Sequence, residues 1–197
     1  MYLAAVVLAT LSATTLASEK KNVDSPERQL KLSPYQDAWK SVENRAKRYQ
    51  LYRSYESDKM FGGSSKCMFI KQTHHNTSHK TAVTEMGYYN STANKIMNFT
   101  ACTRVVKTDS YTKDNVIRAG PCGNLSIFAD SPIIFSDYVT CDVVRAPHTG
   151  NPFDCELWVA EDSITNVKSI CEFAYDVFCN TTMKYSIFDG TCCDQIK

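Results

Sequence analysis

Two short segments of this chain place an acidic side chain two residues away from an aromatic one. Glu156 lies two positions before Trp158, and Phe128 lies two positions before Asp130. Side chains at positions i and i+2 of a β-strand share a face, so each pair would present a carboxylate beside a ring. In a low-dielectric cavity a carboxylate favours a cationic partner, and a ring face adds a cation–π attraction of about 0.5–2 kcal/mol. These pairs predict a site for a small ammonium or imidazolium ligand, such as a biogenic amine.

Simpler structural roles are open for the same residues. Trp158 and Phe128 belong to types that often only fill a core, and Asp130, just before a Ser-Pro pair, is placed to begin a turn. A register shift of one residue would turn Glu156 toward water and Leu157 inward. In the unshifted register Leu157 faces a packing helix instead. The binding interpretation therefore depends on strand register.

The remaining motifs give no sign of metal or catalytic chemistry. His74, His75 and His79 cluster near the glycosylation sequon at Asn76. A metal site needs converging ligands held by further hydrogen bonds, and a glycan would crowd them, so we expect a solvated loop and no metal. The sequence contains no Walker loop, His-Glu-x-x-His or Gly-x-Ser-x-Gly motif. We therefore expect no enzyme activity and no cofactor.

The elements that would position these residues are mainly β. Turn-rich stretches separate short runs of strand character. The predicted strands are Arg48–Tyr55, Cys67–Thr73, Thr81–Tyr89, Lys95–Val106, Val116–Gly120, Asn124–Asp130, Ile133–Val144 and Cys155–Ala160. Eight strands at hairpin spacing predict an antiparallel up-and-down barrel, wide enough to hold one small ligand. A β-sandwich is the alternative.

Two helices flank the strands in this prediction. Ser33, Pro34 and Gln36 form a helix-start signal, so a short helix is expected over Pro34–Asn44. Apolar residues recur at spacings of three and four within Asn166–Asn180, with Ser163 or Thr165 as the cap. This second helix should pack on the outer wall of the barrel.

Composition and targeting signals indicate a secreted protein. The formal net charge of the 197 residues is +1, which argues against nucleic-acid partners and against a polybasic membrane-surface protein. Residues 1–17 form an uncharged apolar run, shorter than the roughly 20 residues of a membrane span, before small residues typical of signal-peptide cleavage. Residues 18–32 are predicted as a flexible polar tail and residues 33–197 as one domain, with no membrane anchor. The five sequons are at Asn76, Asn90, Asn98, Asn124 and Asn180.

The nine cysteines allow four disulfides and one spare thiol, as expected outside the cell. Eight cysteines have 105 possible pairings. Cys102 and Cys122 lie symmetrically about a predicted hairpin turn, so they are candidates for a cross-strand bridge. Another candidate bridge, Cys155 with Cys179, would join a strand to the end of the last helix. The neighbours at 192 and 193 rarely bond to each other, so one of them is the expected spare thiol or forms an intermolecular bridge.

Several motifs in this chain resemble those of the tick salivary lipocalins, the histamine-binding-protein family. The motifs are Gln36-Asp-Ala-Trp-Lys-Ser41, Tyr55-x-x-Asp58-x-x-Phe61-Gly62, Cys141-Asp142, Glu156-Leu157-Trp158 and Cys171. The resemblance implies a secreted lipocalin barrel with a helix on its wall. It also implies a ligand-binding set made of Tyr55, Asp58, Phe61, Phe128, Asp130, Glu156 and Trp158. The disulfides implied are Cys141–Cys171 and a bridge from Cys67 to Cys192 or Cys193.

Departures from the family pattern limit the expected binding. Ala101 or Cys102 stands where the family's binder has a glutamate on a middle strand. Ser41 and Asp142 match a second amine site, but Arg45 stands where that site has an aspartate and would repel a cation. At most one amine site is therefore expected. The resemblance predicts a secreted lipocalin that sequesters a host amine such as histamine or serotonin. The alternatives are a carrier of a sterol, fatty acid or eicosanoid, and a modulator that binds a host protein with its outer surface.

Overall fold

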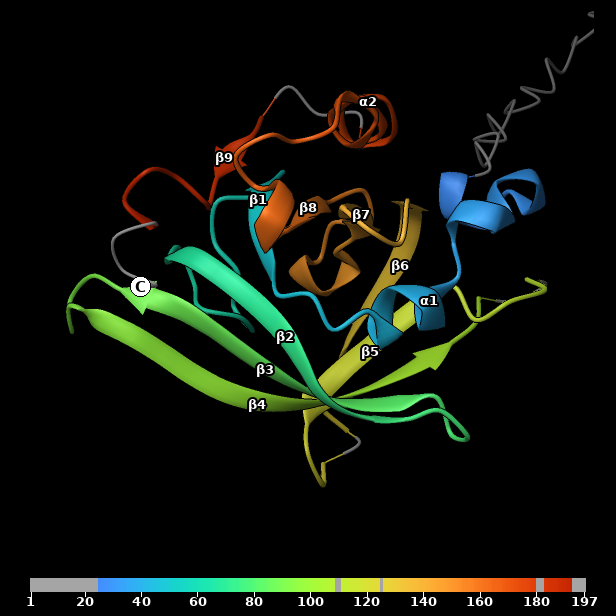
Figure 1. Cartoon of the computed structure of the whole chain (residues 1–197), viewed down its shortest axis with the longest axis horizontal. Helices are drawn as coiled ribbons and strands as arrows, with labels where there is room; N and C mark the ends of the chain where they lie inside the picture. Colours follow the sequence, from blue (N-terminus) through green and yellow to red (C-terminus); the bar gives the residue numbers. More distant parts are fainter. Residues whose placement is uncertain (1–24, 109–110, 125, 180–182, 193–197) are drawn as a thin grey trace, which may run out of the picture.

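The computed structural model describes residues 25–108, 111–124, 126–179 and 183–192. These residues form a closed antiparallel β-barrel with a helix on its wall (Figure 1). The predicted signal peptide, the sequon at Asn180 and Cys193 lie outside the described residues. Among the described helices, none combines the length and apolarity that crossing a bilayer requires.

Eight strands follow one another around the barrel in chain order. They are β1 (Arg48–Arg53), β2 (Lys66–Asn76), β3 (Thr81–Asn90), β4 (Lys95–Val106), β5 (Val116–Pro121), β6 (Ala129–Ser136), β7 (Cys141–Arg145) and β8 (Cys155–Ala160). The first strand pairs with both β2 and β8, which closes the sheet on itself. A two-residue strand, β9 (Tyr185–Ser186), adds to β1. The predicted eight-stranded barrel is confirmed, and the β-sandwich alternative is wrong.

Two of the predicted strands are misplaced, while others differ from the structure by a few residues at their ends. Asn124–Asp130 is not a strand, since β6 begins only at Ala129. The run Ile133–Val144 is split between β6 and β7 by a turn at Asp137. The Asp137 carboxylate accepts hydrogen bonds from the backbone amides of Val139, Thr140 and Cys141 at 3.0, 2.6 and 3.0 Å. This one side chain pairs with three backbone amides of the turn, and the turn separates the end of β6 from the start of β7.

The N-terminal segment is ordered further upstream than predicted. Residues 26–32 were assigned above to a flexible tail. They instead contain the 3-10 helix η1 (Pro26–Arg28) and the first residues of a second one, η2 (Leu30–Tyr35). Glu27 in η1 is buried and forms an ion pair with Arg145 at 3.1 Å. The following helix α1 (Ala38–Glu43) is capped by Asp37, whose carboxylate accepts from two amides in the first turn. The helix therefore starts four residues later than predicted.

The C-terminal helix α2 (Ser169–Phe178) packs on the outer wall formed by β6, β7 and β8 (Figure 1). It is shorter than the predicted Asn166–Asn180, and Lys168 rather than Ser163 or Thr165 occupies the N-cap position. Leu157 and Val159 of β8 belong to the core under this helix. Since strand side chains alternate, Glu156 and Trp158 of the same strand face the barrel interior. Two short 3-10 turns flank β8, η3 (Pro147–Thr149) and η4 (Glu161–Ser163).

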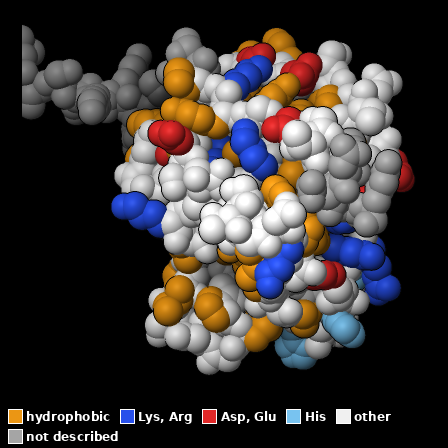
Figure 2. Space-filling view, turned by 90° about the vertical axis from the view of Figure 1, so that its left-hand side faces the viewer, with side chains coloured by type: hydrophobic (Ala, Val, Ile, Leu, Met, Phe, Trp, Pro, Cys, Tyr) orange, Lys and Arg blue, Asp and Glu red, His pale blue; other side chains and the backbone are white. Residues whose placement is uncertain are grey.

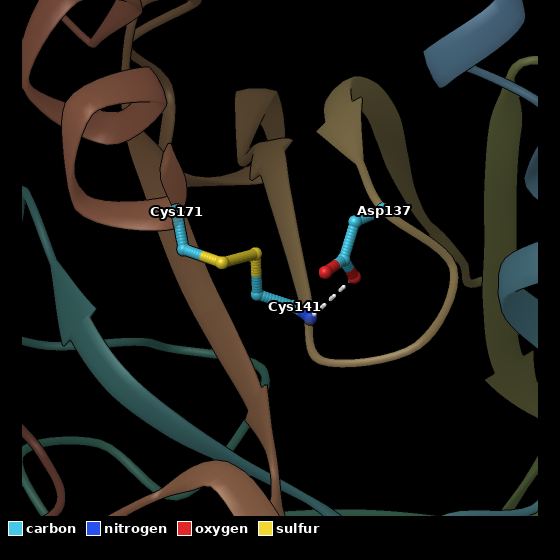
Figure 3. Close-up of side chains that lie close together, drawn as sticks. All are labelled: Asp137, Cys141 and Cys171. Atoms are coloured by element: carbon cyan, nitrogen blue, oxygen red, sulfur yellow. Dashed lines mark hydrogen bonds between the residues drawn. A yellow bond between two sulfur atoms is a disulfide. The ribbon is translucent and has the colours of Figure 1, made fainter. Parts of the chain in front are cut away.

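Four disulfides tie the strands, the helix and the C-terminal segment together. They are Cys67–Cys192, Cys102–Cys122, Cys141–Cys171 and Cys155–Cys179. Each bridge joins a pair expected from the sequence, and Cys192 rather than its neighbour takes the bond to the barrel. Figure 3 shows Cys141–Cys171 beside Asp137. Although these three residues are grouped closely enough for a metal site, both sulfurs are already used in a disulfide.

The described sequons lie at the surface. Asn76, Asn98 and Asn124 are exposed, and Asn90 is partly exposed. Met97 and Phe99, on either side of Asn98, are less exposed than that asparagine. On the face drawn in Figure 2, basic and acidic side chains are interspersed, in keeping with the near-zero formal net charge.

Candidate functional site

The end of the barrel opposite α1 holds a buried group of acidic and aromatic side chains. The first strand runs from Arg48, near α1, to Arg53, so the residues after it reach this end. The Tyr55 hydroxyl lies between Asp58, 3.0 Å from its Oδ2, and Glu156 Oε1. Because a phenol has one proton to donate, one of the two carboxyls must be protonated for both hydrogen bonds to form.

Each carboxyl has further donors. Trp158 donates its indole N–H to Glu156 Oε2 at 2.7 Å. The backbone amides of Met60 and Phe61 donate to Asp58 Oδ1 at 2.8 and 2.9 Å. These bonds leave both carboxyls with defined positions, as a specific charge-recognition site requires.

His148 completes this group, and the sequence analysis did not identify it. It lies in η3, between β7 and β8, and its Nε2 is 3.1 Å from Asp58 Oδ2. Only 6% of its side chain is exposed, and its Nδ1 has no partner among the described residues. The ring packs edge-on against Phe61 and Tyr55, with centroid distances of 5.6 and 6.3 Å. The only sequence signal was a histidine in a Pro- and Gly-rich turn, which is more typical of a solvated loop.

Burial and mutual contacts shift the pKa of each ionisable group. Burial raises the pKa of Glu156, and the nearby Asp58 charge adds to this effect, against the bonds from Tyr55 and Trp158. Burial also opposes ionisation of Asp58, but the hydrogen bond and charge of His148 and the two backbone amides outweigh it, so the pKa of Asp58 is lowered. Burial alone would lower the pKa of His148, yet its carboxylate neighbours raise it above 6.5. The directions of these three pKa shifts favour a neutral Glu156 beside an Asp58–His148 ion pair.

These residues line one end of an interior cavity of about 90 Å³. Its wall is formed by Gln50, Asp58, Phe61, Met68, Ile70, Gln72, Thr84, Met86, Thr103, Ile117, Ala119, Ala129, Ser131, Asp142, Val144, His148, Glu156 and Trp158. Of the seven predicted ligand residues, Asp58, Phe61, Glu156 and Trp158 line it. Tyr55 is buried and does not line it, but its hydroxyl bonds to both carboxyls.

Phe128 and Asp130 lie outside this cavity, and the strand-face argument for them is wrong. Phe128 precedes the start of β6 and is 39% exposed. Asp130 accepts two hydrogen bonds from Arg118 of β5, at 2.6 and 2.7 Å. The Arg118 guanidinium also lies 4.0 Å from the Phe128 ring centroid. The carboxylate and the ring therefore contact the same cation, which is the protein's own arginine.

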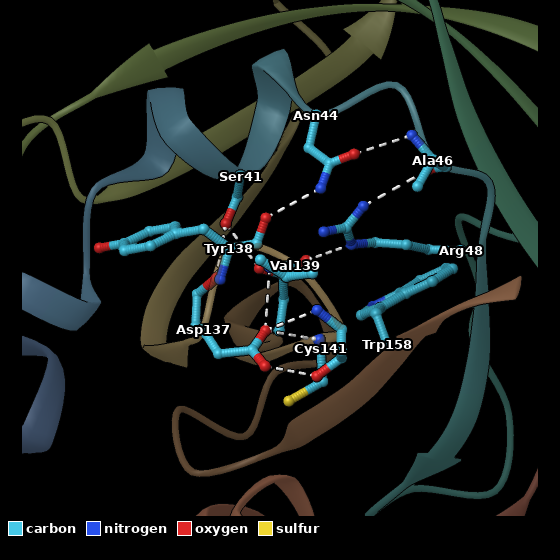
Figure 4. Close-up of polar contacts among 12 residues, drawn as sticks. Ser41, Asn44, Ala46, Arg48, Asp137, Tyr138, Val139, Cys141 and Trp158 are labelled. Carbon is cyan, nitrogen blue, oxygen red and sulfur yellow. Dashed lines mark hydrogen bonds and ion pairs between the residues drawn. The ribbon is translucent and has the colours of Figure 1, made fainter. Parts of the chain in front are cut away.

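The opposite end of the cavity has a second carboxylate with its own cation. Asp142 accepts hydrogen bonds from Ser41 at 2.5 Å and from Arg48 Nε at 2.6 Å, in the polar network around α1 drawn in Figure 4. Arg45, which we expected to repel an amine here, is instead exposed and bonds to His75. The cation beside Asp142 is thus Arg48 and not Arg45.

The three clustered histidines do not converge. His74 and His75 belong to β2 rather than to a loop, which corrects the prediction, and His79 bonds to Asn76. The described residues contain one other close group of potential metal ligands, made of Asp58, His148 and Glu156, with ligand atoms within 4.8 Å of one another. Every carboxyl oxygen in it already has a protein hydrogen-bond partner.

Comparison with known proteins identifies relatives of the whole barrel. A family model described as "Tick histamine binding protein" matches residues 26–194. The male-specific histamine-binding salivary protein of Rhipicephalus appendiculatus is 29% identical over 169 residues, which cover 82% of this chain and 84% of that protein.

Solved structures with low sequence identity share the fold. Japanin from Rhipicephalus appendiculatus bound to cholesterol has a TM-score of 0.51 and 15% identity, and covers 77% of this chain and 98% of its own. Lobster apocrustacyanin A1 has a TM-score of 0.51 and 11% identity, and covers 81% of this chain and 83% of its own.

Proposed function

The chain belongs to the tick histamine-binding protein family, and from this membership we propose that it sequesters a small host amine such as histamine or serotonin. The ammonium or imidazolium group would lie between Asp58 and Glu156, against the rings of Phe61 and Trp158. The protein would act in saliva by mass action, as a secreted carrier and not as an enzyme. The name of its male-specific histamine-binding relative supports both the ligand class and the salivary location.

The observation that carries this proposal is the convergence of two buried carboxyls and aromatic rings at one end of a small cavity. Asp58 and Glu156 come from different parts of the chain, yet one tyrosine hydroxyl lies between them. A carboxylate in such low-dielectric surroundings interacts strongly with a cation, and an aromatic face adds to the attraction.

The size of the cavity favours an amine over a lipid. About 90 Å³ is well below the roughly 300–1,000 Å³ typical of pockets for drug-sized ligands. A sterol would require the apolar middle of the barrel, around Met68, Met86 and Ile117, to open. The lipid alternative is supported by the lack of a glutamate in the middle of β4, where Ala101 or Cys102 stands.

Calorimetry on the secreted protein tests the proposal. We expect heat with histamine or serotonin at micromolar concentrations, and a loss of about tenfold to hundredfold in affinity for Glu156→Gln, from a hydrogen bond to a charged group of about 1.5–3 kcal/mol. Asp130→Asn is the matched control, since Asp130 lies outside the cavity and should leave affinity unchanged. No heat with either amine would contradict the proposal. A lipid that co-purifies in native mass spectrometry would favour the carrier alternative.

A further inference from the structure

The two carboxylates that line opposite ends of the cavity are each paired with a cation of the protein itself. Asp142 pairs with Arg48, whose guanidinium keeps its charge at any physiological pH. Asp58 pairs with His148, whose imidazole can lose its charge near neutral pH. One end of the cavity is thus permanently neutralised, and the other is neutralised only while a histidine holds a proton.

The surroundings of His148 have the composition expected for a bound amine. Its Nε2 faces Asp58, its ring meets Phe61 and Tyr55 edge-on, and it offers a ligand atom within 4.8 Å of Glu156. We call the position bounded by Asp58, Glu156, Phe61 and Tyr55 the cation seat. Two cations cannot share a seat of this size without strong repulsion in low-dielectric surroundings.

We propose that His148 is a resident imidazole that occupies the cation seat, and that a ligand amine binds by displacing it, so that His148 sets the affinity and selectivity of the site. The inference rests on the proposed amine-binding function. The displaced ring would leave the seat while Asp58 and Glu156 remain to receive the ligand.

The hydrogen bonds around His148 allow its side chain to rotate away while the η3 turn stays in place. Among the described residues, a single hydrogen bond holds its ring, the one to Asp58, and its Nδ1 is unpartnered. The backbone around it is held more firmly, because the Thr149 amide donates to Ala146 O at 3.2 Å and Thr149 Oγ1 donates to Asp154 Oδ2 at 2.7 Å. Rotation of the ring therefore breaks one bond and leaves the turn in place.

Displacement has a proton balance that can be measured. The groups that face His148 are Asp58 in the loop after β1, Tyr55 in the same loop, Glu156 on β8 and Asp154 just before β8. When a protonated amine takes the seat, His148 loses its carboxylate partner and Glu156 gains a cationic one. Each change favours loss of a proton from its own group, so binding releases up to two protons near neutral pH, one from His148 and one from Glu156, and affinity rises with pH until the amine itself deprotonates.

Calorimetry with histamine, in two buffers of different ionisation enthalpy, measures this release. We expect His148→Ala to bind histamine about tenfold more tightly at pH 7, because the cation seat of the wild type would be free in roughly one molecule in ten. Histamine binding to this variant should also release fewer protons. His148→Lys should lower affinity at least tenfold, because lysine is a cation with an ordinary pKa of about 10.4. Structural damage would lower affinity in both variants. His74→Ala, a change at an exposed histidine outside the cavity, should match the wild type.

A second measurement does not depend on any ligand. The ring resonances of His148, followed by NMR in the free protein, should titrate above pH 6.5, and Asp58→Asn should lower the midpoint. A midpoint below 6.5, or equal histamine affinity and equal proton release in the wild type and His148→Ala, would overturn the resident-imidazole proposal while leaving amine binding intact. No histamine or serotonin binding in any variant would overturn the proposed function, and the displacement step with it.

Discussion

Arg48 donates a hydrogen bond from Nε to Asp142 Oδ2 at 2.6 Å, and the two side chains are only 2% and 7% exposed. Asp142 would otherwise be an unpaired charge at the α1 end of the cavity. Arg48 Nη2 has no partner among the described residues, so this ion pair is the main compensation for burying the guanidinium. The pair therefore neutralises the Asp142 charge at this end of the cavity.

Removing one member of this pair should destabilise the protein. We expect Asp142→Asn to lower the free energy of unfolding by about 3–5 kcal/mol, the usual cost of leaving a buried charge unpaired. Urea unfolding at pH 7 measures it. The control is Asp114→Asn, which breaks the more exposed pair with Lys80 and should cost less than about 1 kcal/mol. Similar small losses for both variants would contradict the prediction.

Tyr55 should act by positioning the two carboxyls. Tyr55→Phe removes the hydroxyl between Asp58 and Glu156 while keeping the ring, so we expect histamine affinity to fall about threefold to tenfold, the worth of one ordinary hydrogen bond. The matched control is Tyr52→Phe, in the core under α2, which should leave affinity unchanged. Equal affinity in the two variants would show that the hydroxyl has no part in binding.

The unfolding free energy should fall as pH rises through the neutral range. His148 has a raised pKa in the folded protein, so its contribution is fully present below about pH 6.5 and is lost as pH rises through the folded value. The raised pKa of Glu156 acts in the same direction, starting from about pH 4.5. The lowered pKa of Asp58 acts only in acid, where its contribution is lost as pH falls.

Urea unfolding between pH 5.5 and 8.5 checks this slope, a range chosen to begin roughly one unit below the ordinary histidine pKa. The double variant His148→Asn, Glu156→Gln should show a flatter profile than the wild type. His79→Ala, which removes an exposed histidine, should keep the wild-type slope. A wild-type stability that rises with pH over this range would contradict the assigned shifts.

The disulfides should differ in how readily a mild reductant opens them. Cys102 and Cys122 are exposed, whereas Cys141 and Cys171 are fully buried under α2. Because thiol–disulfide exchange requires access to a sulfur, we expect Cys102–Cys122 to be reduced first in the folded protein. Alkylation followed by peptide mass spectrometry identifies the order. Earlier labelling of Cys141 or Cys171 would indicate that α2 opens more readily than the barrel edge.

The architecture was largely readable from the sequence because its signals are local. Alternation in Cys155–Ala160 correctly placed Glu156 and Trp158 on the inner face, since a strand repeats every two residues. Tyr55, Asp58 and Phe61 are close in sequence, so one loop brings them together. The break at Asp137 was missed, because its effect depends on three amides meeting one carboxylate within an apolar run.

Tertiary structure alone decided which cation each carboxylate meets. The bond from Arg48 to Asp142 spans 94 positions and that between Asp58 and His148 spans 90. Sequence periodicity gives the face of a strand but not the residue that lies across the barrel from it. The sequence thus determined an acidic and aromatic barrel interior. The closed sheet brings distant charges within about 3 Å of each other in low-dielectric surroundings. It alone determined that the carboxylate at one end of the cavity pairs with an arginine and the carboxylate at the other end with a titratable histidine.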